Sequence, residues 1–363
     1  MILANFGTLR AMSHSFLKRI VSLTVALSTV GFLSPAFAQS SFPDVSEKDQ
    51  AAVEFVKARG IMQGYADPSA PLGTSFLFKP KQKLTRAESV KILVATKLSA
   101  EEIQTFTKRS YTDVPETAWY RPYVEAAFHK LGLIDGPPKT TVFNGDRPVQ
   151  KVEFLKLLFK SQNVDTNAYS EIALPLAVDV TDTKAWFYPA MRYAVSTVMI
   201  YTNAEGKLRP EAELTRAEAA ELLYLLAMYQ AGKRTQAGLT TEETYLVQTL
   251  ESLDKKDFAQ ADMASARALL TSRGALTSKP TTAIVQAAVK IAEAFRALVR
   301  AYRAGTEGRL DDVLTLSKEA WGLADRAQQL SASLADLSLR VKDIASGMAN
   351  QAREMIKQSL PPS

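Results

Sequence analysis

The sequence predicts a mainly helical protein in two parts, a threefold internal repeat followed by a C-terminal helical region. The first observation is that Leu84-Thr85-Arg86-Ala87-Glu88 returns as Leu214-Thr215-Arg216-Ala217-Glu218, at an offset of 130 (216 minus 86). A degenerate copy, Val149-Gln150-Lys151-Val152-Glu153, stands halfway, and three copies in equal register indicate a repeat. The second observation is that apolar residues recur every three or four positions after about residue 238, which is typical of helices.

Each copy of the motif precedes an apolar helical run. Thr85 with Glu88, and Thr215 with Glu218, fit a capping box, so a structural role is the preferred interpretation for these four residues. Arg86 and Arg216 take the first helical position, where the helix dipole disfavours a cation. A cation kept there predicts contact with an anion. A solvated arginine lying along its own helix remains the alternative.

The three repeats share a series of spaced features. An Asp-Val pair comes first, then in two repeats an aromatic pair with a proline, then a short helix, a glycine turn, a loop and the motif helix. The Asp-Val pairs contain Asp44, Asp113 and Asp179, and the aromatic pairs begin with Trp119 and Trp186. The glycine turns are Gly60-x-x-x-Gly64-Tyr65 and Gly132-x-x-x-Gly136.

This series resembles the S-layer homology (SLH) domain in three tandem copies. The resemblance implies a pseudo-trimer with three prongs, one helix from each repeat in a central bundle, and grooves between the prongs. In the family these grooves bind secondary cell-wall polysaccharide, often with a pyruvylated amino sugar, and the motif arginine meets the acidic group. Carried over by position, the candidate glycan-binding residues are Asp44, Gly64, Tyr65 and Arg86 in repeat one, Asp113, Trp119, Gly132 and Lys151 in repeat two, and Asp179, Trp186 and Arg216 in repeat three.

No repeat matches the pattern completely. Repeat one has Asp49-Gln50 where a tryptophan belongs, repeat two has Gln150-Lys151, and repeat three has Val198 to Tyr201 in place of the glycine turn. One or two of the three grooves are therefore expected to bind, with the Lys151 groove weakest because lysine lacks the guanidinium fork. Two structural alternatives stay open: the tryptophans belong to the prong cores, which is the preferred interpretation, and the three aspartates are helix caps only.

The start of the chain has the pattern of an export signal. Arg10, Lys18 and Arg19 precede the apolar stretch 20–33, and Ala36-Phe37-Ala38 is a small-x-small cleavage site. We expect cleavage after Ala38, whether Met1 or Met12 initiates, and residence at the cell wall or envelope surface. Without these three cations the formal charge falls from +6 to +3, which does not favour nucleic-acid binding, and the absence of cysteine excludes disulfides and Cys-ligated zinc.

The expected divisions are a signal peptide at 1–38, repeats at 39–107, 108–174 and 175–232, a polar connector at 231–238 and a helical domain at 238–360. Within the last, helices are expected at 241–253, 257–270 and 281–304, with a break over 272–280. One or two helices follow from 310 to about 360, with a weak point near 331–333. Sixteen Lys and Arg against fifteen Asp and Glu indicate an ordinary solvated face. This helical domain is expected to fold as a helical bundle or a coiled hairpin.

The enzyme interpretation is poor. His129 is the one histidine after the signal and has a structural role as its preferred interpretation, and no catalytic, metal or cofactor motif occurs. The main hypothesis is non-covalent attachment to cell-wall polysaccharide or a peptidoglycan-linked glycan, with the helical part as a scaffold, a partner-binding part or a site of self-association. The alternative is an envelope or periplasmic adaptor in which the repeats are structural only.

Overall fold

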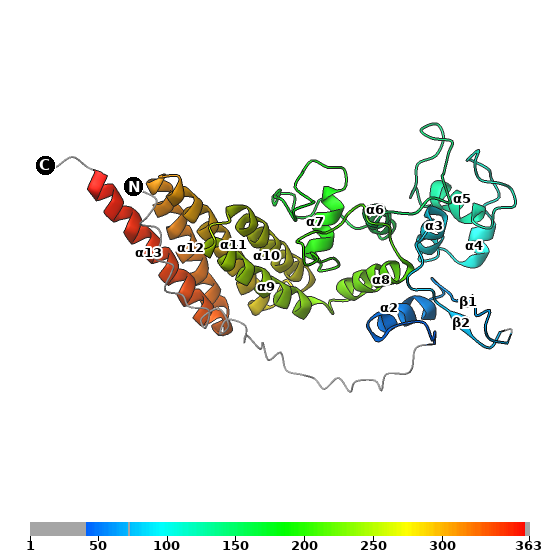
Figure 1. The fold of residues 1–363 in the computed structure, drawn as a ribbon, viewed down its shortest axis with the longest axis horizontal. Coiled ribbons are helices and arrows are strands. Elements are labelled where there is room, and N and C mark those ends of the chain that lie inside the picture. Colours follow the sequence, from blue (N-terminus) through cyan, green and yellow to red (C-terminus); the bar gives the residue numbers. More distant parts are fainter. Residues whose placement is uncertain (1–40, 72, 360–363) are drawn as a thin grey trace.

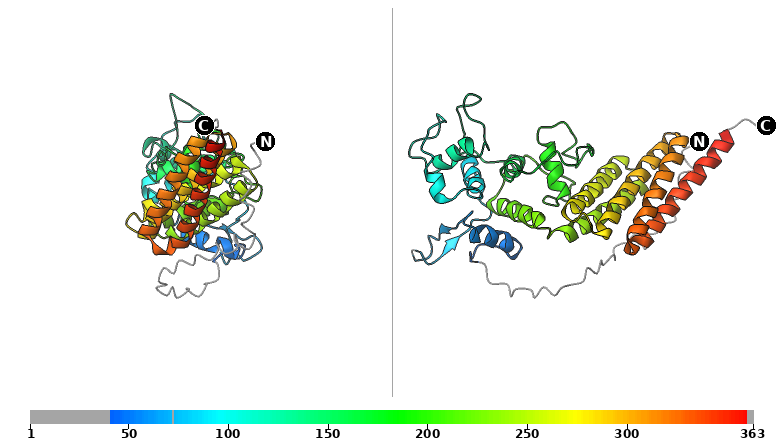
Figure 2. Two further views of the ribbon diagram at one scale, coloured as in Figure 1. Left: turned by 90° about the vertical axis from the view of Figure 1, so that its left-hand side faces the viewer. Right: turned by 180° about the vertical axis from the view of Figure 1, so that it is seen from behind.

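A computed structural model describes residues 41–71 and 73–359 of the chain. The predicted signal peptide and its cleavage site lie outside the described residues. The protein is mainly helical, as the sequence predicts, and it is elongated, with the three repeats at one end and the last C-terminal helices at the other (Figure 1). The view from behind in Figure 2 shows the same division.

Each repeat supplies two helices, one short helix and one motif helix. The pairs are α2 (Glu47–Ala58) with α3 (Arg86–Val94), α5 (Arg121–His129) with α6 (Lys151–Ser161), and α7 (Tyr188–Ser196) with α8 (Arg216–Gln230). A small antiparallel hairpin, β1 (Tyr65–Ala66) with β2 (Phe76–Leu77), belongs to repeat one, and α4 (Ala100–Gln104) follows α3. The prolines that follow the two aromatic pairs stand in the first turn of α5 and α7, as their position in the sequence predicts.

The residues just before the three motif helices close a ring of backbone hydrogen bonds. The N–H of Leu84 donates to the carbonyl of Leu214 at 2.9 Å, that of Leu214 to Val149 at 2.9 Å, and that of Val149 to Leu84 at 3.0 Å. All three side chains are buried. Since each motif helix begins two residues later, the ring sets the starts of α3, α6 and α8 around one pseudo-threefold axis.

Packing between the repeats follows the same cycle. The motif helix of each repeat packs on the short helix of the next one: α3 on α5, α6 on α7, and α8 on α2. Apolar residues from all three repeats form one continuous core. The repeats therefore bury their apolar faces against each other and not each within itself.

Both predicted capping boxes are confirmed. The Thr85 hydroxyl accepts from the N–H of Glu88, whose carboxylate accepts from the N–H of Thr85 at 2.8 Å. Thr215 and Glu218 repeat this arrangement at α8. In repeat two the N–H of Gln150 donates to the Glu153 carboxylate at 3.0 Å. Thr and Glu of the motif thus hold helix starts, which is what their spacing predicts.

The C-terminal region forms successive helices, each packed on the next. They are α9 (Thr235–Asp254), α10 (Phe258–Ser278), α11 (Ala283–Thr306), α12 (Leu310–Leu330), the 3-10 turn η2 (Ala332–Leu334) and α13 (Ala335–Ser359). The weak point near 331–333 is confirmed. The break expected from residue 272 is wrong, because α10 continues to Ser278. The connector at 231–238 is also shorter than expected, because α9 already begins at Thr235 and buries Gly238.

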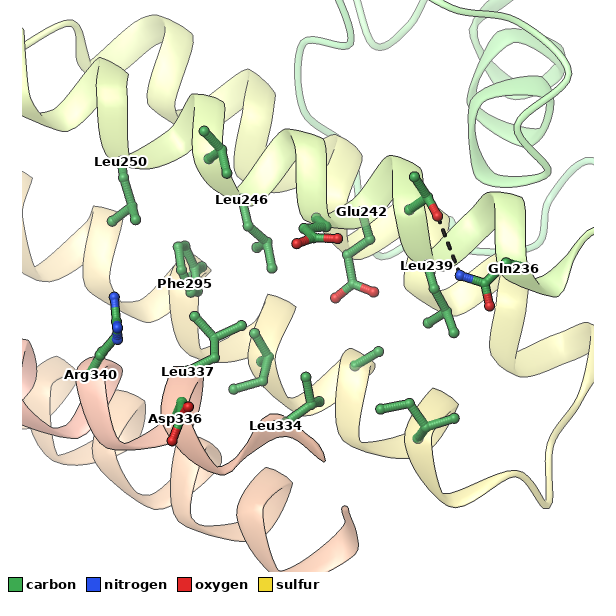
Figure 3. A pocket seen from close by; sticks show the side chains of 16 residues that line it. Gln236, Leu239, Glu242, Leu246, Leu250, Phe295, Leu334, Asp336, Leu337 and Arg340 are labelled. Atoms are coloured by element: carbon green, nitrogen blue, oxygen red, sulfur yellow. Dashed lines mark hydrogen bonds between the residues drawn. The ribbon is translucent and has the colours of Figure 1, made fainter. Parts of the chain in front are cut away.

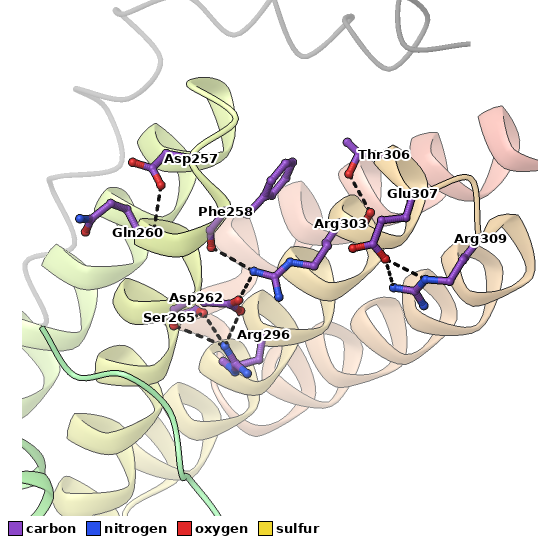
Figure 4. Close-up of polar contacts among 10 residues, drawn as sticks. All are labelled: Asp257, Phe258, Gln260, Asp262, Ser265, Arg296, Arg303, Thr306, Glu307 and Arg309. Atoms are coloured by element: carbon purple, nitrogen blue, oxygen red, sulfur yellow. Dashed lines mark hydrogen bonds and ion pairs between the residues drawn. The ribbon is translucent and has the colours of Figure 1, made fainter. Parts of the chain in front are cut away.

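An ion-pair cluster fixes α10 against α11 (Figure 4). The Asp262 carboxylate accepts from Arg296 at 3.2 Å and also from Arg303. Arg296 further donates to the hydroxyl of Ser265 at 3.0 Å. Asp257 caps α10 by accepting from the N–H of Gln260. These contacts are structural, since the two arginines share one carboxylate between packed helices.

The repeats and the C-terminal helices meet where α10 packs on α7. A Cβ at Gly274 would lie 1.9 Å from the carbonyl oxygen of Ser196, so only glycine permits this approach. The Tyr229 hydroxyl donates to the Gly274 carbonyl at 2.9 Å, and Leu270 belongs to the core of the repeats. In the parts of the chain that the structure describes, no helix combines the length and the apolar character needed to cross a membrane.

Candidate functional site

The three aspartates of the Asp-Val pairs bind the backbone of a loop. Each carboxylate accepts two consecutive N–H groups about thirty residues later, at 2.7–2.9 Å. The pairs are Phe78 and Lys79 for Asp44, Phe143 and Asn144 for Asp113, and Leu208 and Arg209 for Asp179. The second residue of each pair has positive φ, so the carboxylate holds a strained turn. The helix-cap alternative is wrong, because none of the three occupies a cap position.

The motif cations reach across to the next repeat. Arg86 Nε donates to the Phe143 carbonyl at 3.0 Å, Lys151 Nζ to the Leu208 carbonyl at 3.0 Å, and Arg216 Nε to the Phe78 carbonyl at 2.8 Å. The candidate residues therefore combine across repeats and not within one. Arg216 joins Asp44 and Tyr65, Arg86 joins the loop of Asp113, and Lys151 joins that of Asp179. We name these the three–one, one–two and two–three grooves.

In the three–one groove, each of the three guanidinium nitrogens of Arg216 donates a hydrogen bond to repeat one. Besides Phe78, Arg216 donates to the Tyr65 hydroxyl at 3.2 Å and the Gln63 carbonyl at 2.9 Å, and its guanidinium lies 4.7 Å from the Tyr65 ring centroid. Its side chain is only 5% exposed. Burial lowers its pKa, and no carboxylate of the described residues lies within ion-pair distance. A solvated arginine is therefore the wrong description of Arg216.

In the one–two groove, most of the guanidinium N–H donors of Arg86 make no hydrogen bond within the described chain. Within the described chain, the Phe143 carbonyl is the one hydrogen-bond partner of its guanidinium, which is half-buried beside the Phe143 ring. Burial lowers its pKa, and the positive charge of Arg147 lowers it further. Arg147 is bound at two points by Glu153, at 2.9 and 2.5 Å. Glu153 therefore pairs with Arg147, and among the described residues Arg86 has no carboxylate within ion-pair distance.

In the two–three groove, lysines replace arginine. Lys151 is half-buried, and burial lowers its pKa. Lys156, one turn further along α6, lies 4.9 Å from the centroid of the Trp186 ring. A cation already covers the aromatic surface there, and neither lysine offers a planar fork to a carboxylate.

Both tryptophans are exposed, which corrects the preference for a place in the prong cores. Trp119 is 58% and Trp186 is 56% exposed. Trp119 makes edge contacts with Tyr120 and Tyr123. Tyr120 in turn contacts the Phe143 ring, so aromatic rings continue from Trp119 to Arg86. Large exposed aromatic side chains are suited to contact with a ligand.

The two candidate glycines act through the backbone. A Cβ at Gly64 would lie 2.3 Å from the Phe42 ring, and Gly132 has φ of +55°, a conformation that favours glycine. Sequence reasoning missed Gln63, Arg147 and Lys156. The five-residue spacing of Lys156 from Lys151 was a signal, whereas the other two lie in loops whose position depends on the neighbouring repeat.

The surroundings of His129 do not form a proton relay. The Ser110 hydroxyl and the Glu125 carboxylate both face its Nε2 atom, at 3.0 and 3.2 Å, so the ring cannot pass a proton from one to the other through its two nitrogens. Glu125 is buried and also accepts from the N–H of Ser110, which holds the loop before α5. Within residues 41–71 and 73–359, no group of three or more His, Cys, Asp or Glu side chains is placed to hold a metal ion.

Comparison with known protein families matches the S-layer homology domain at residues 41–88, 110–155 and 179–220. The chain therefore carries three tandem SLH domains, followed by a C-terminal helical region. SLH domains are in general non-catalytic modules that attach proteins to the cell surface or cell wall. No curated protein matches the chain.

Proposed function

We propose that the chain is exported and attaches non-covalently to an acidic cell-wall polysaccharide, with the one–two groove as the principal binding site. The observation that supports this most directly is the open fork of Arg86, which is linked through aromatic rings to the exposed Trp119. A guanidinium offers two parallel donors to a carboxylate, such as that of a pyruvylated sugar, and the indole offers a flat face to a sugar ring.

The other two grooves are proposed as weaker sites. In the three–one groove, Tyr65 and Gln63 already take donors of Arg216, and Lys79 lies 4.6 Å from the centroid of the Tyr65 ring. In the two–three groove, Lys156 covers Trp186. Only part of each cation is left for a ligand. This ranking agrees with the expectation that one or two grooves bind.

The test is sedimentation with purified wall sacculi. Arg86→Ala should weaken binding about tenfold to a hundredfold, because a hydrogen bond to a charged group contributes roughly 1.5–3 kcal/mol. Arg86→Lys should recover part of the affinity. Arg59→Ala is the matched control, since Arg59 is exposed at the end of α2 and lies outside the grooves. Sacculi whose carboxyl groups have been converted to amides should bind poorly.

The same assay decides between attachment and the adaptor alternative. The observation that favours the adaptor is that Arg216 and all three aspartates find partners within the fold. If wild-type protein stays in the supernatant with intact sacculi, the repeats are structural only. If Arg86→Ala pellets as well as wild type, the one–two groove is not the site.

The C-terminal helices are proposed as a scaffold or partner-binding part that the repeats hold at the wall. We propose that the third repeat ends at residue 232 and that the helical part begins at residue 238. Exposed Lys233 offers trypsin a site at this boundary. Because α10 packs on α7 across it, the two fragments should remain together on gel filtration after cleavage. Fragments that separate while folded would define two independent domains.

A further inference from the structure

A narrow groove runs along α11 in the C-terminal region. Its walls are α9 on one side and η2 with the start of α13 on the other, and its enclosed volume is about 160 Å³. Leu246, Ile291, Phe295 and Leu337 are among the apolar side chains that line it (Figure 3). This groove lies in a different part of the chain from the SLH domains, so it requires a role of its own.

One acidic side chain points into this apolar space. Glu242 projects from α9 between the helices and is only 3% exposed. Its Oε1 atom has no hydrogen-bond partner among the described residues. Burial raises the pKa of Glu242 well above its ordinary value, and the neighbouring charge of Glu243 raises it further. The Oε1 atom is therefore a buried hydrogen-bonding atom without a partner among the described residues, in a largely apolar site.

Folding alone gives no reason for an acid at this position. An unpaired polar group buried among apolar atoms costs roughly 1–3 kcal/mol, and an apolar residue of similar size would avoid that cost. The other buried acid of the chain with known contacts, Glu125, is satisfied by Ser110. The contrast indicates that the partner of Glu242 comes from outside the described residues.

We propose that this groove binds a small alkyl amine, whose hydrocarbon body lies along α11 and whose amino group donates to Glu242. The amine is favoured over an acid because Glu243 would repel a second carboxylate, whereas a bound ammonium group would stabilise the ionised form of Glu242. Arg340, the positive residue in the lining, lies toward the Leu250 end of the groove in Figure 3, away from Glu242. An amine thus meets two acidic side chains and an apolar surface.

The size of the groove favours a narrow ligand. An apolar cavity of about 150 Å³ holds a molecule of the size of benzene. A chain of methylene groups with a terminal amine is narrow enough to lie along this space.

The experiment measures the binding of decylamine, decanol and decanoate to the mature chain by isothermal titration calorimetry at pH 7. Decylamine should bind most tightly, and decanoate should bind at least tenfold more weakly. In Glu242→Gln, which keeps the size of the side chain, decylamine should lose about tenfold in affinity while decanol changes little.

Two further variants give the controls. Glu251→Gln removes an exposed acid from the same helix and should bind like wild type. Ala288→Leu places extra volume in the floor of the groove and should weaken all three ligands. Circular dichroism checks that each variant is folded. If Ala288→Leu does not fold, the order of the three ligands and the Glu242→Gln result still decide the matter.

Three outcomes would overturn the proposal. Wild-type protein that does not bind decylamine has no such site. Equal affinity for decylamine and decanoate, or tighter binding of decanoate through Arg340, would show that Glu242 does not select the ligand. Unchanged decylamine affinity in Glu242→Gln would show the same. None of these measurements uses the wall glycan, so they are independent of the attachment function.

Discussion

Arg86 and Arg216 come from the same five-residue motif, at the same position of the same capped helix, and yet they meet different surroundings. Arg216 is buried and donates to three groups of repeat one, whereas Arg86 is half-buried and donates to one carbonyl of repeat two. The difference lies in the receiving repeat. Repeat one presents Tyr65 and Gln63 to the incoming guanidinium, and repeat two presents an ion pair of Arg147 with Glu153.

This comparison teaches that a repeated motif does not repeat its function. The cation of one repeat completes the groove of the next, so the properties of each groove depend on two different segments of sequence. An arginine satisfied inside the fold stabilises the pseudo-trimer, and one with free donors is available to a ligand. The predictions below test this division of roles.

The largest effect is expected for stability. Arg216→Ala should lower the free energy of unfolding by about 3 kcal/mol, because it leaves the buried Phe78 carbonyl, the part-buried Gln63 carbonyl and the Tyr65 hydroxyl without this donor. Arg86→Ala should lower it by only about 1 kcal/mol. Urea denaturation of both variants measures the difference. Equal losses would show that the two arginines have the same structural role, and the comparison would fail.

The pH dependence of stability tests the buried carboxyl group of Glu242, whose Oε1 atom has no hydrogen-bond partner among the described residues. The pKa of Glu242 is raised in the folded state, so the unfolded chain loses its proton first as pH rises above about 4.5. Stability contributed by the protonated group is therefore lost with increasing pH. Glu242→Gln should match wild type near pH 4 and exceed it increasingly toward pH 8. Urea midpoints that stay parallel over this range would contradict the raised pKa.

The two tryptophans sharpen the ranking of the grooves. Trp119→Ala should weaken binding to sacculi by on the order of 1 kcal/mol, or about fivefold, because an exposed aromatic face is lost from the open groove. Trp186→Ala should have less effect, because Lys156 covers that ring. The reverse order in sedimentation would move the principal site to the two–three groove.

The smallest effect concerns the incomplete cap of repeat two. Gln150→Thr should add about 0.5–1 kcal/mol of stability, since the hydroxyl would accept an N–H at the start of α6 as in the other repeats. Thr85→Ala is the opposite change and should cost about 1 kcal/mol. Thermal unfolding compares the two. Loss of stability in Gln150→Thr would mean that the ring of backbone bonds, and not the cap, governs this helix start.

The sequence by itself determined the three repeats, their capped helices and the helical character of the remainder, because local hydrogen bonds and apolar spacing depend on residues a few positions apart. It could also name Arg86, Trp119 and Arg216 as candidates through the motif that contains them. Only the tertiary structure decided that Trp119 and Trp186 are exposed, that Arg216 is enclosed by Tyr65 and Gln63, and that the Glu242 Oε1 atom has no partner among the described residues. Each of these depends on segments far apart in the chain, whose packing sets which polar groups are satisfied and which remain free.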